Sequence, residues 1–126
     1  MSTTDSGRLG EVKVLARLVE LGWYPFTDLS GKCPVDILAW KNGETISVQV
    51  KSSDRIVYGD SYSVQIGSVR HNRTSNTVNM FDNTSVDYLA VFFKTPNKVC
   101  FFKASEITSK RSKNVRVSEM DQYSEI

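Results

Sequence analysis

The dipeptide Asn42-Gly43 constrains the fold of this chain more than any other feature of the sequence. Asparagine followed by glycine suits the two central positions of a tight hairpin turn, because both residues adopt positive φ at low cost. The flanking runs, Val35 to Trp40 and Glu44 to Ser52, have the length and composition of strands. The sequence therefore predicts a β-hairpin in which Lys41 faces Glu44.

One face of this predicted hairpin is apolar and the other carries polar side chains. The apolar face consists of Val35, Ile37, Ala39, Ile46, Val48 and Val50. Because side chains alternate along a strand, this face is expected to contact the core. On the opposite face the turn places Asp36 directly across from Gln49, with Cβ atoms roughly 5 Å apart, and Lys51 lies on the diagonal. The alternation of apolar residues and the Asn42-Gly43 turn predict the same register.

A helix is predicted before the hairpin, with Ser6 as N-cap and Gly22 just beyond its C-terminus. An apolar stripe recurs at steps of three or four residues: Leu9, Val12, Leu15, Ala16 and Val19. Glu11 lies on the flank of this stripe. An acid at that position either reaches water at the rim or is held there for a function.

The other elements follow from shorter patterns. Strands are expected at Trp23 to Phe26, Ser61 to Ile66, Asp87 to Phe93 and Lys98 to Phe102, and short helices at Thr77 to Phe81 and Ser105 to Lys110. The order of helix, strands and mixed elements favours an α/β (α+β) fold with a mixed central sheet flanked by helices.

Length and composition narrow the class of protein. A chain of 126 residues suits one domain, residues 1–126, with a short polar C-terminal tail. No apolar run is long enough to span a bilayer, and the N-terminus does not resemble a secretion signal, so we expect no membrane partner and a cytoplasmic protein. Two cysteines and one histidine are too few for a structural zinc site.

The polar face of the hairpin has the chemistry of a phosphodiesterase. The Asp36 carboxylate, the Gln49 amide oxygen and a nearby backbone carbonyl, such as that of Val50, are hard oxygen ligands of the kind that Mg²⁺ prefers. Beside such an ion, Lys51 is placed to orient or deprotonate an attacking water. The alternative is a solvated strand face without function, which is the ordinary role of a single Asp, Gln or Lys.

These residues resemble the motifs of the PD-(D/E)XK nuclease superfamily. The resemblance rests on Glu11, Gly22-Trp23, Pro34-Val35-Asp36 and Gln49-Val50-Lys51, and it covers chiefly residues 1–55. The Gln-Val-Lys-Ser form is most similar to the group I intron-associated homing endonucleases. Archaeal Holliday-junction resolvases are also similar, although they normally carry Glu-Val-Lys.

The resemblance implies a restriction-endonuclease-like core and a site-specific double-strand DNA endonuclease that uses Mg²⁺ or Mn²⁺. It implies that Asp36, Gln49, Val50 and Glu11 bind the metal, and that Lys51 positions or activates water. The glutamine at position 49 removes one negative charge from the usual set. Two alternatives therefore remain, namely a junction-resolving or repair nuclease and a DNA-binding module that has lost catalysis.

Basic and polar residues supply candidate DNA contacts. They are Arg8, Lys13, Arg17, Ser52, Arg70, His71, Asn72, Arg73, Lys110, Arg111 and Lys113. Because double-strand cleavage needs two active sites, a homodimer is expected, and the resemblance extends this to a homotetramer in a bacterial or phage-infected cell. The aromatic residues of two adjacent strands are the predicted exposed contacts: Tyr88, Phe92, Phe93, Phe101 and Phe102.

Overall fold

The computed structural model describes residues 2–71 and 76–126, without the side chains of residue 3 and residues 68–78. Its elements occur in this order: α1 (Thr3–Glu20), β1 (Tyr24–Phe26), β2 (Ile37–Lys41), β3 (Glu44–Ser53), β4 (Ile56–Val57), β5 (Ser61–Gln65), β6 (Ser68–His71), β7 (Asn76–Asn79), β8 (Tyr88–Phe93), β9 (Lys98–Lys103), η1 (Ala104–Glu106), β10 (Ser112–Arg116) and η2 (Val117–Tyr123).

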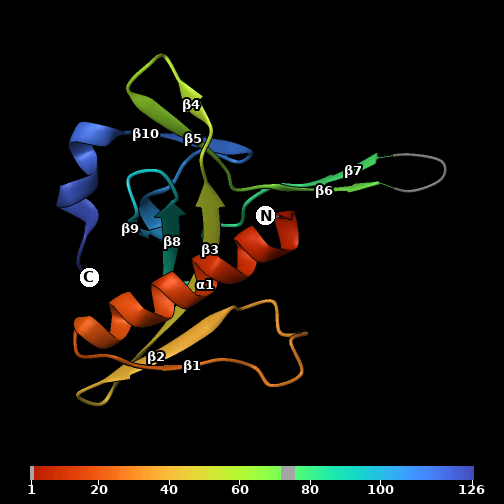
Figure 1. Ribbon diagram of the computed structural model, residues 1–126. Helices are drawn as coiled ribbons and strands as arrows, with labels where there is room; N and C mark the ends of the chain where they lie inside the picture. The colour runs from red at the N-terminus through yellow and green to blue at the C-terminus, as the bar shows by residue number, and fades with distance from the viewer. Residues whose placement is uncertain (1, 72–75) are drawn as a thin grey trace.

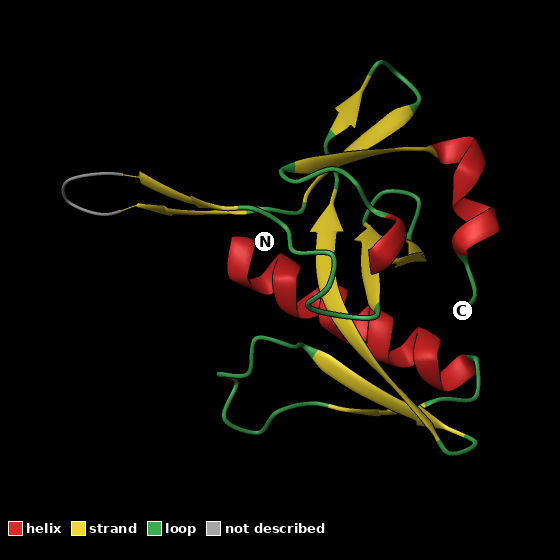
Figure 2. Cartoon of the chain, turned by 180° about the vertical axis from the view of Figure 1, so that it is seen from behind, coloured by secondary structure: helices red, strands yellow, loops and turns green. Residues whose placement is uncertain are grey.

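A mixed five-stranded sheet forms the centre, in the order β1-β2-β3-β8-β9. Strands β3 and β8 are parallel, and every other neighbouring pair in this sheet is antiparallel. Helix α1 crosses one face of the sheet, and the hairpin of β6 and β7 projects away from the body (Figure 1). A second sheet, β10-β5-β4, and the 3-10 helix η2 lie on the opposite side (Figure 2). The predicted mixed α/β class is confirmed.

The central hairpin has the register that the turn predicted. Lys41 pairs with Glu44, and Ile37 pairs with Val48. Asn42 and Gly43 have φ of 51° and 83°, as a turn with two left-handed central residues requires. The apolar face is buried at its centre, which confirms the predicted core face of the hairpin.

The helix begins earlier than the sequence suggested. Ser2, and not Ser6, is the N-cap, because its hydroxyl accepts from the Asp5 backbone N–H while the Asp5 carboxylate accepts from the Ser2 backbone N–H. At the other end Gly22 adopts φ of +88° directly after the cap residue Leu21. The predicted glycine stop is therefore confirmed.

The buried stripe of α1 differs from the predicted one. Val12 and Val19 are 59% and 60% exposed, whereas Val14 and Leu18 are fully buried. The physical reason is Gly10, which lies on the same stripe one turn before Val14. A Cβ atom on Gly10 would overlap the Ser52 hydroxyl, so only the glycine side of the helix can approach β3 this closely.

Two hydrophobic cores sandwich the central sheet. The first lies between α1 and the sheet and includes Val14, Leu18, Ile37, Ala39, Ile46, Val48, Ala90 and Phe101. The second lies between the central sheet and β5, β10 and η2, and includes Tyr62, Val64, Leu89, Val91, Phe93, Phe102, Val115 and Met120. Because successive residues of β8 and β9 point to opposite faces, these strands supply both cores.

The prediction that the aromatic residues of β8 and β9 are exposed is therefore wrong. Phe92, Phe93, Phe101 and Phe102 are buried, and Tyr88 is half-buried. A sheet that is covered on both faces needs large apolar side chains on both sides of its central strands. Exposed aromatic side chains occur instead at the edge of the sheet, where the Tyr24 and Trp40 rings lie 5.9 Å apart across β1 and β2, and at Tyr58 after β4.

Two predicted helices are absent from the described residues. Residues expected as a helix from Thr77 to Phe81 instead contribute to strand β7, which pairs with β6. Tertiary pairing overrides a weak local preference at this segment. The segment from Ser105 to Lys110 contains only the end of the short helix η1 before β10 begins. The expected polar tail includes η2, whose Met120 is buried in the second core.

Candidate active site

Asp36 and Gln49 are joined by a hydrogen bond across the central hairpin. The Gln49 Nε2 group donates to Asp36 Oδ2 at 2.9 Å. The backbone N–H of Val50 donates to the same carboxylate oxygen at 2.8 Å. Asp36 directly precedes β2, so its carboxylate reaches the middle of β3 at the point that the turn register fixes.

The environment of Asp36 shifts its proton affinity. Partial burial raises the pKa of the carboxyl group above its ordinary value of 3.8, because a charge is less well solvated there. The hydrogen bond from the Val50 backbone and the positive charge of Lys51 act in the opposite direction. The effect of burial on the pKa is larger than the two opposing effects together. A further positive charge near Asp36 would therefore stabilise the ionised form of its carboxylate.

A cavity of about 480 Å³ brings these residues together with the first half of α1. Its lining consists of Thr4, Ser6, Gly7, Arg8, Glu11, Asp36, Gln49, Val50, Lys51 and Ser52. Glu11, Asp36, Gln49 and Lys51 are all half-buried. The structure thus places the four predicted catalytic residues around one pocket between the helix and β3.

The oxygen atoms of this pocket fit a hard divalent cation. Both hydrogen bonds to Asp36 end on Oδ2, and Gln49 uses its nitrogen, so Asp36 Oδ1 and Gln49 Oε1 remain as ligand atoms. Glu11 adds a second carboxylate and Val50 offers its backbone carbonyl. Within residues 2–71 and 76–126 no three His, Cys, Asp or Glu side chains gather as a metal site. The amide of Gln49 stands where a third acid would complete such a set.

The predicted DNA contacts near the helix divide into two groups. Arg8 and Ser52 line the pocket that holds Asp36. Lys13 and Arg17 lie in a different groove, between α1 and η2. There the Lys13 ammonium lies 5.7 Å from the centre of the Phe92 ring, and the Arg17 guanidinium donates twice to the Ser124 carbonyl.

The other predicted DNA contacts belong to two groups, Arg70 to Arg73 and Lys110 to Lys113, and the backbone of Lys110 and Arg111 bonds to residues that flank the hairpin of β6 and β7. Arg70 and His71 belong to β6 of the projecting hairpin, and the predictions for Asn72 and Arg73 lie outside the described residues (Figure 1). In the C-terminal cluster Lys110 and Arg111 are exposed. Lys113 instead lies 4.9 Å from the centre of the Phe102 ring, on the core side of β10.

Sequence reasoning missed several residues that line the cavity at Asp36 and the cavity beside it. The first turns of α1 contribute Gly7 and also Thr4 and Ser6, and the misplaced N-cap had left the last two outside the helix. Arg55 and Gln65 line a neighbouring cavity. The alternation that predicted β5 already placed its odd-numbered residues, Gln65 included, on a polar face, but nothing in the sequence set that face against β3.

Comparisons with known proteins identify the family and the fold. A family model described as PD-(D/E)XK endonuclease matches residues 1–125. A solved bacterial homing endonuclease, I-Ssp6803I, has a similar fold with a TM-score of 0.81 at 20% sequence identity, and the match covers 91% of this chain and 78% of that one. No curated protein sequence matches the chain. In the described parts of the chain, no helix has the length and hydropathy required to cross a membrane.

Proposed function

The chain belongs to the PD-(D/E)XK endonuclease family, and from this premise we propose that it hydrolyses double-stranded DNA at specific sites as a metal-dependent, homing-type endonuclease. The observation that carries the proposal is the hydrogen bond between Gln49 and Asp36 in a pocket shared with Lys51 and Glu11. That arrangement supplies oxygen ligands and a cationic side chain within one cavity.

Asp36, Glu11, Gln49 and the Val50 carbonyl would hold the ion, and nucleases of this family generally use divalent metals. We propose Mg²⁺ or Mn²⁺. When bound, the ion stabilises the negative charge that develops on the scissile phosphate. Lys51 positions the attacking water beside the phosphorus, where a fixed cationic donor lowers the cost of aligning the nucleophile. The hydrogen bond from Gln49 keeps the Asp36 carboxylate in one orientation.

The duplex would approach the pocket from the side of Arg8 and Ser52. Of the remaining candidates, Arg111 borders an adjoining cavity, and Arg70 and His71 belong to a hairpin that projects from the body (Figure 1). Phosphate contacts from such residues hold the duplex in position, whereas base contacts confer specificity. The Lys13 and Arg17 side chains are engaged elsewhere, so they contribute less to this surface.

Cleavage of both strands requires two active sites that face opposite strands. We therefore propose a homodimer or a homotetramer, acting in the cytoplasm of a bacterial or phage-infected cell where its DNA substrate is found. The outer face of β1 and β2 offers an apolar surface for such contacts, because Tyr24, Phe26 and Trp40 are exposed there.

Cleavage assays on two substrates test this proposal. The protein is incubated with Mg²⁺ and either long linear duplex DNA or a synthetic four-way junction. We expect discrete double-strand breaks in the linear DNA and no preference for the junction. Preferential cutting of the junction would assign the protein to the resolving nucleases, and DNA binding without any cleavage would indicate an inactive module.

The Lys51→Ala variant links cleavage to the pocket. We expect its cleavage rate to fall by about 10²- to 10⁴-fold, because the lysine acts on water, while DNA affinity stays nearly unchanged. Lys103→Ala is the matched control, since Lys103 is exposed on the edge strand β9, two strands away from β3. A loss of binding as large as the loss of activity would make Lys51 a phosphate contact instead.

A further inference from the structure

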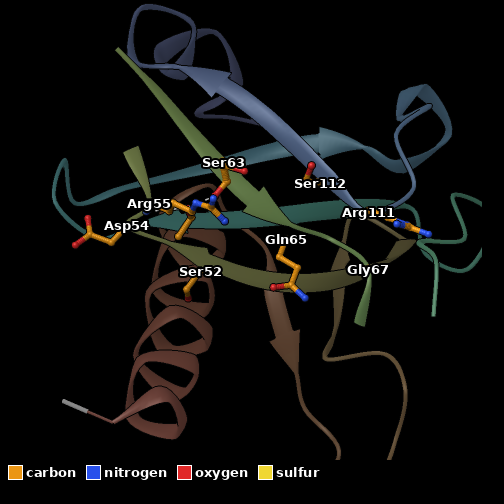
Figure 3. Close-up of a pocket in the computed structure, with 9 residues that line it drawn as sticks. Ser52, Asp54, Arg55, Ser63, Gln65, Gly67, Arg111 and Ser112 are labelled. Carbon is orange, nitrogen blue, oxygen red and sulfur yellow. Dashed lines mark hydrogen bonds between the residues drawn. The ribbon is translucent and has the colours of Figure 1, made fainter. Parts of the chain in front are cut away.

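A second cavity, of about 580 Å³, lies beside the catalytic pocket at the C-terminal end of β3. Its lining consists of Ser52, Ser53, Asp54, Arg55, Ser63, Gln65, Gly67, Arg111 and Ser112. These residues come from β3 and the segment after it, from β5, and from the start of β10 (Figure 3). Ser52 lines both cavities and directly follows Lys51, so the two spaces adjoin along β3.

The walls of this cavity are held by fixed contacts. The Ser53 hydroxyl donates to the Ser63 carbonyl at 2.6 Å, which ties the end of β3 to β5. The Arg111 carbonyl accepts from the backbone N–H groups of Ile66 and Gly67 at 2.9 and 3.1 Å. A Cβ atom on Gly67 would come within 2.9 Å of the Asn79 carbonyl, so the glycine permits this close approach of strands. The cavity is therefore part of the fold, and its shape does not depend on a single side chain.

The charge of the cavity is positive. Two arginines, Arg55 and Arg111, stand on opposite sides of it (Figure 3). The acid among the lining residues, Asp54, points away and accepts from the Thr95 backbone N–H and hydroxyl. Neither guanidinium forms an ion pair with an acid of the described residues. Two unneutralised guanidinium groups around one cavity favour an anionic ligand.

The remaining side chains of the cavity are polar and can form hydrogen bonds with the edge of a planar ligand such as a base. Gln65 extends into the space from β5, opposite Ser112 in the strand register (Figure 3). An amide carries both a donor and an acceptor, and glutamine pairs in this way with the edge of a base, adenine above all. The volume lies within the range of cavities that hold small organic ligands. Two guanidinium groups that can bind phosphate, together with an amide that can bond to the edge of a base, fit a nucleotide.

We propose that this second cavity binds one nucleotide of the DNA strand adjacent to the scissile phosphate, with the two phosphates that flank it on Arg55 and Arg111, one on each side, and its base edge on Gln65. The proposal rests on the proposed nuclease function, because a strand that enters the catalytic pocket continues past Ser52 into this cavity. Gln65 is then a specificity-determining residue, and the cavity sets which base the enzyme prefers beside the cut.

The phosphate contact is tested by DNA binding of the Arg55→Ala/Arg111→Ala double variant, measured by fluorescence anisotropy over a series of salt concentrations. Loss of charge-assisted hydrogen bonds predicts an affinity about ten- to a hundredfold weaker. The dependence of log affinity on log salt should become shallower by about two, as for two lost phosphate contacts. Lys103→Ala removes one charge far from the cavity and should change neither quantity. Because both arginines are exposed, the double variant should unfold at the urea concentration of the wild type.

The base contact is tested by sequencing the cleavage products of a duplex pool that is randomised around the cut. In Gln65→Ala the preference should relax by about tenfold at one position beside the cut, and it should be retained elsewhere. Unchanged preferences at every position would overturn the assignment of Gln65.

The outcomes separate this inference from the proposed function. Wild-type protein that neither binds nor cuts DNA refutes the nuclease proposal itself. Wild-type protein that cuts DNA, together with a double variant of unchanged affinity and salt dependence, refutes the second cavity alone. If the double variant binds DNA normally but loses binding of inorganic phosphate, the cavity serves a free anion, and the nucleotide assignment is wrong.

Discussion

Replacing Gln49 with glutamate tests whether the hydrogen bond between Gln49 and Asp36 organises the proposed catalytic pocket, and whether a bound metal ion can take the place of that bond. The two side chains are nearly isosteric, so the variant introduces a charge without a change of volume. In the wild type the Gln49 amide donates to Asp36 Oδ2 at 2.9 Å. Glutamate cannot donate, and at neutral pH it places a second carboxylate against the first.

The expected destabilisation follows from this geometry. Two carboxylates that relax to about 4 Å repel by about 1 kcal/mol in water and by about 4 kcal/mol at an effective dielectric constant of 20. Asp36 is half-buried, so we take a repulsion of about 2 kcal/mol between these limits. The lost hydrogen bond adds about 1 kcal/mol. Without metal, Gln49→Glu should therefore lower the free energy of unfolding by about 3 kcal/mol.

Metal should reverse this loss, because a divalent ion bound between the carboxylates turns their repulsion into attraction. Urea unfolding at about pH 8, with and without Mg²⁺, measures both quantities. We expect Mg²⁺ to stabilise Gln49→Glu by more than it stabilises the wild type. The control is Gln65→Glu, the same change at an exposed position, which should shift stability by about 0.5 kcal/mol or less. A Gln49→Glu protein as stable as the wild type without Mg²⁺ would refute the hydrogen-bonded arrangement.

Three further substitutions test the structure around the pocket. Burial raises the pKa of Asp36, so the stability that its protonated form contributes is present below pH 3.8 and is lost as pH rises through the folded-state pKa. Asp36→Asn should therefore gain stability relative to the wild type between about pH 3.5 and about pH 7.5 in urea unfolding, and a constant difference would contradict the raised pKa. Helix propensity alone predicts that Gly10→Ala raises the free energy of unfolding by about 1 kcal/mol, and the overlap with the Ser52 hydroxyl should reduce this gain. In a Ser52→Ala background the full gain in stability should appear in the same assay. Leu18→Ala should cost about 2–5 kcal/mol and Val12→Ala about 0.5 kcal/mol or less in thermal unfolding; equal costs would mean that the other stripe of the helix is buried.

The hairpin of β2 and β3 could be predicted from the sequence because two independent signals coincide there. The Asn42-Gly43 turn and the alternation of apolar residues both place Asp36 opposite Gln49. A one-residue shift would expose the whole apolar face, so the register has no close competitor. Glu11 could be predicted as a member of the site only with help from the family resemblance, since its position on the helix flank also suits a residue at the rim.

The helix face could not be predicted by counting apolar residues. Two stripes compete on α1, and the one with more apolar side chains contains Val12 and Val19, which are exposed. The buried stripe is selected by the absence of a side chain at Gly10, and this close contact with Ser52 exists only in the folded protein. The same limit applies to the second cavity, because Arg55, Gln65 and Arg111 come from three segments that only the tertiary fold unites.

The parallel pairing of β3 with β8 governs how this molecule acquires its active site. Val48 pairs with Tyr88, forty residues later in the chain. Closing a loop of about forty residues costs about 3 kcal/mol of chain entropy, whereas the hairpin of β2 and β3 closes through two residues. The hairpin should therefore form early, while the edge of β3 that β8 will occupy stays open during a slow, high-contact-order step. The residues of this edge run from Val48 to Ser53 and include the apolar Val48 and Val50, so nascent chains can pair with each other there. Refolding yield should consequently fall as protein concentration rises, and a chain truncated before β8 should aggregate although it contains all four proposed catalytic residues.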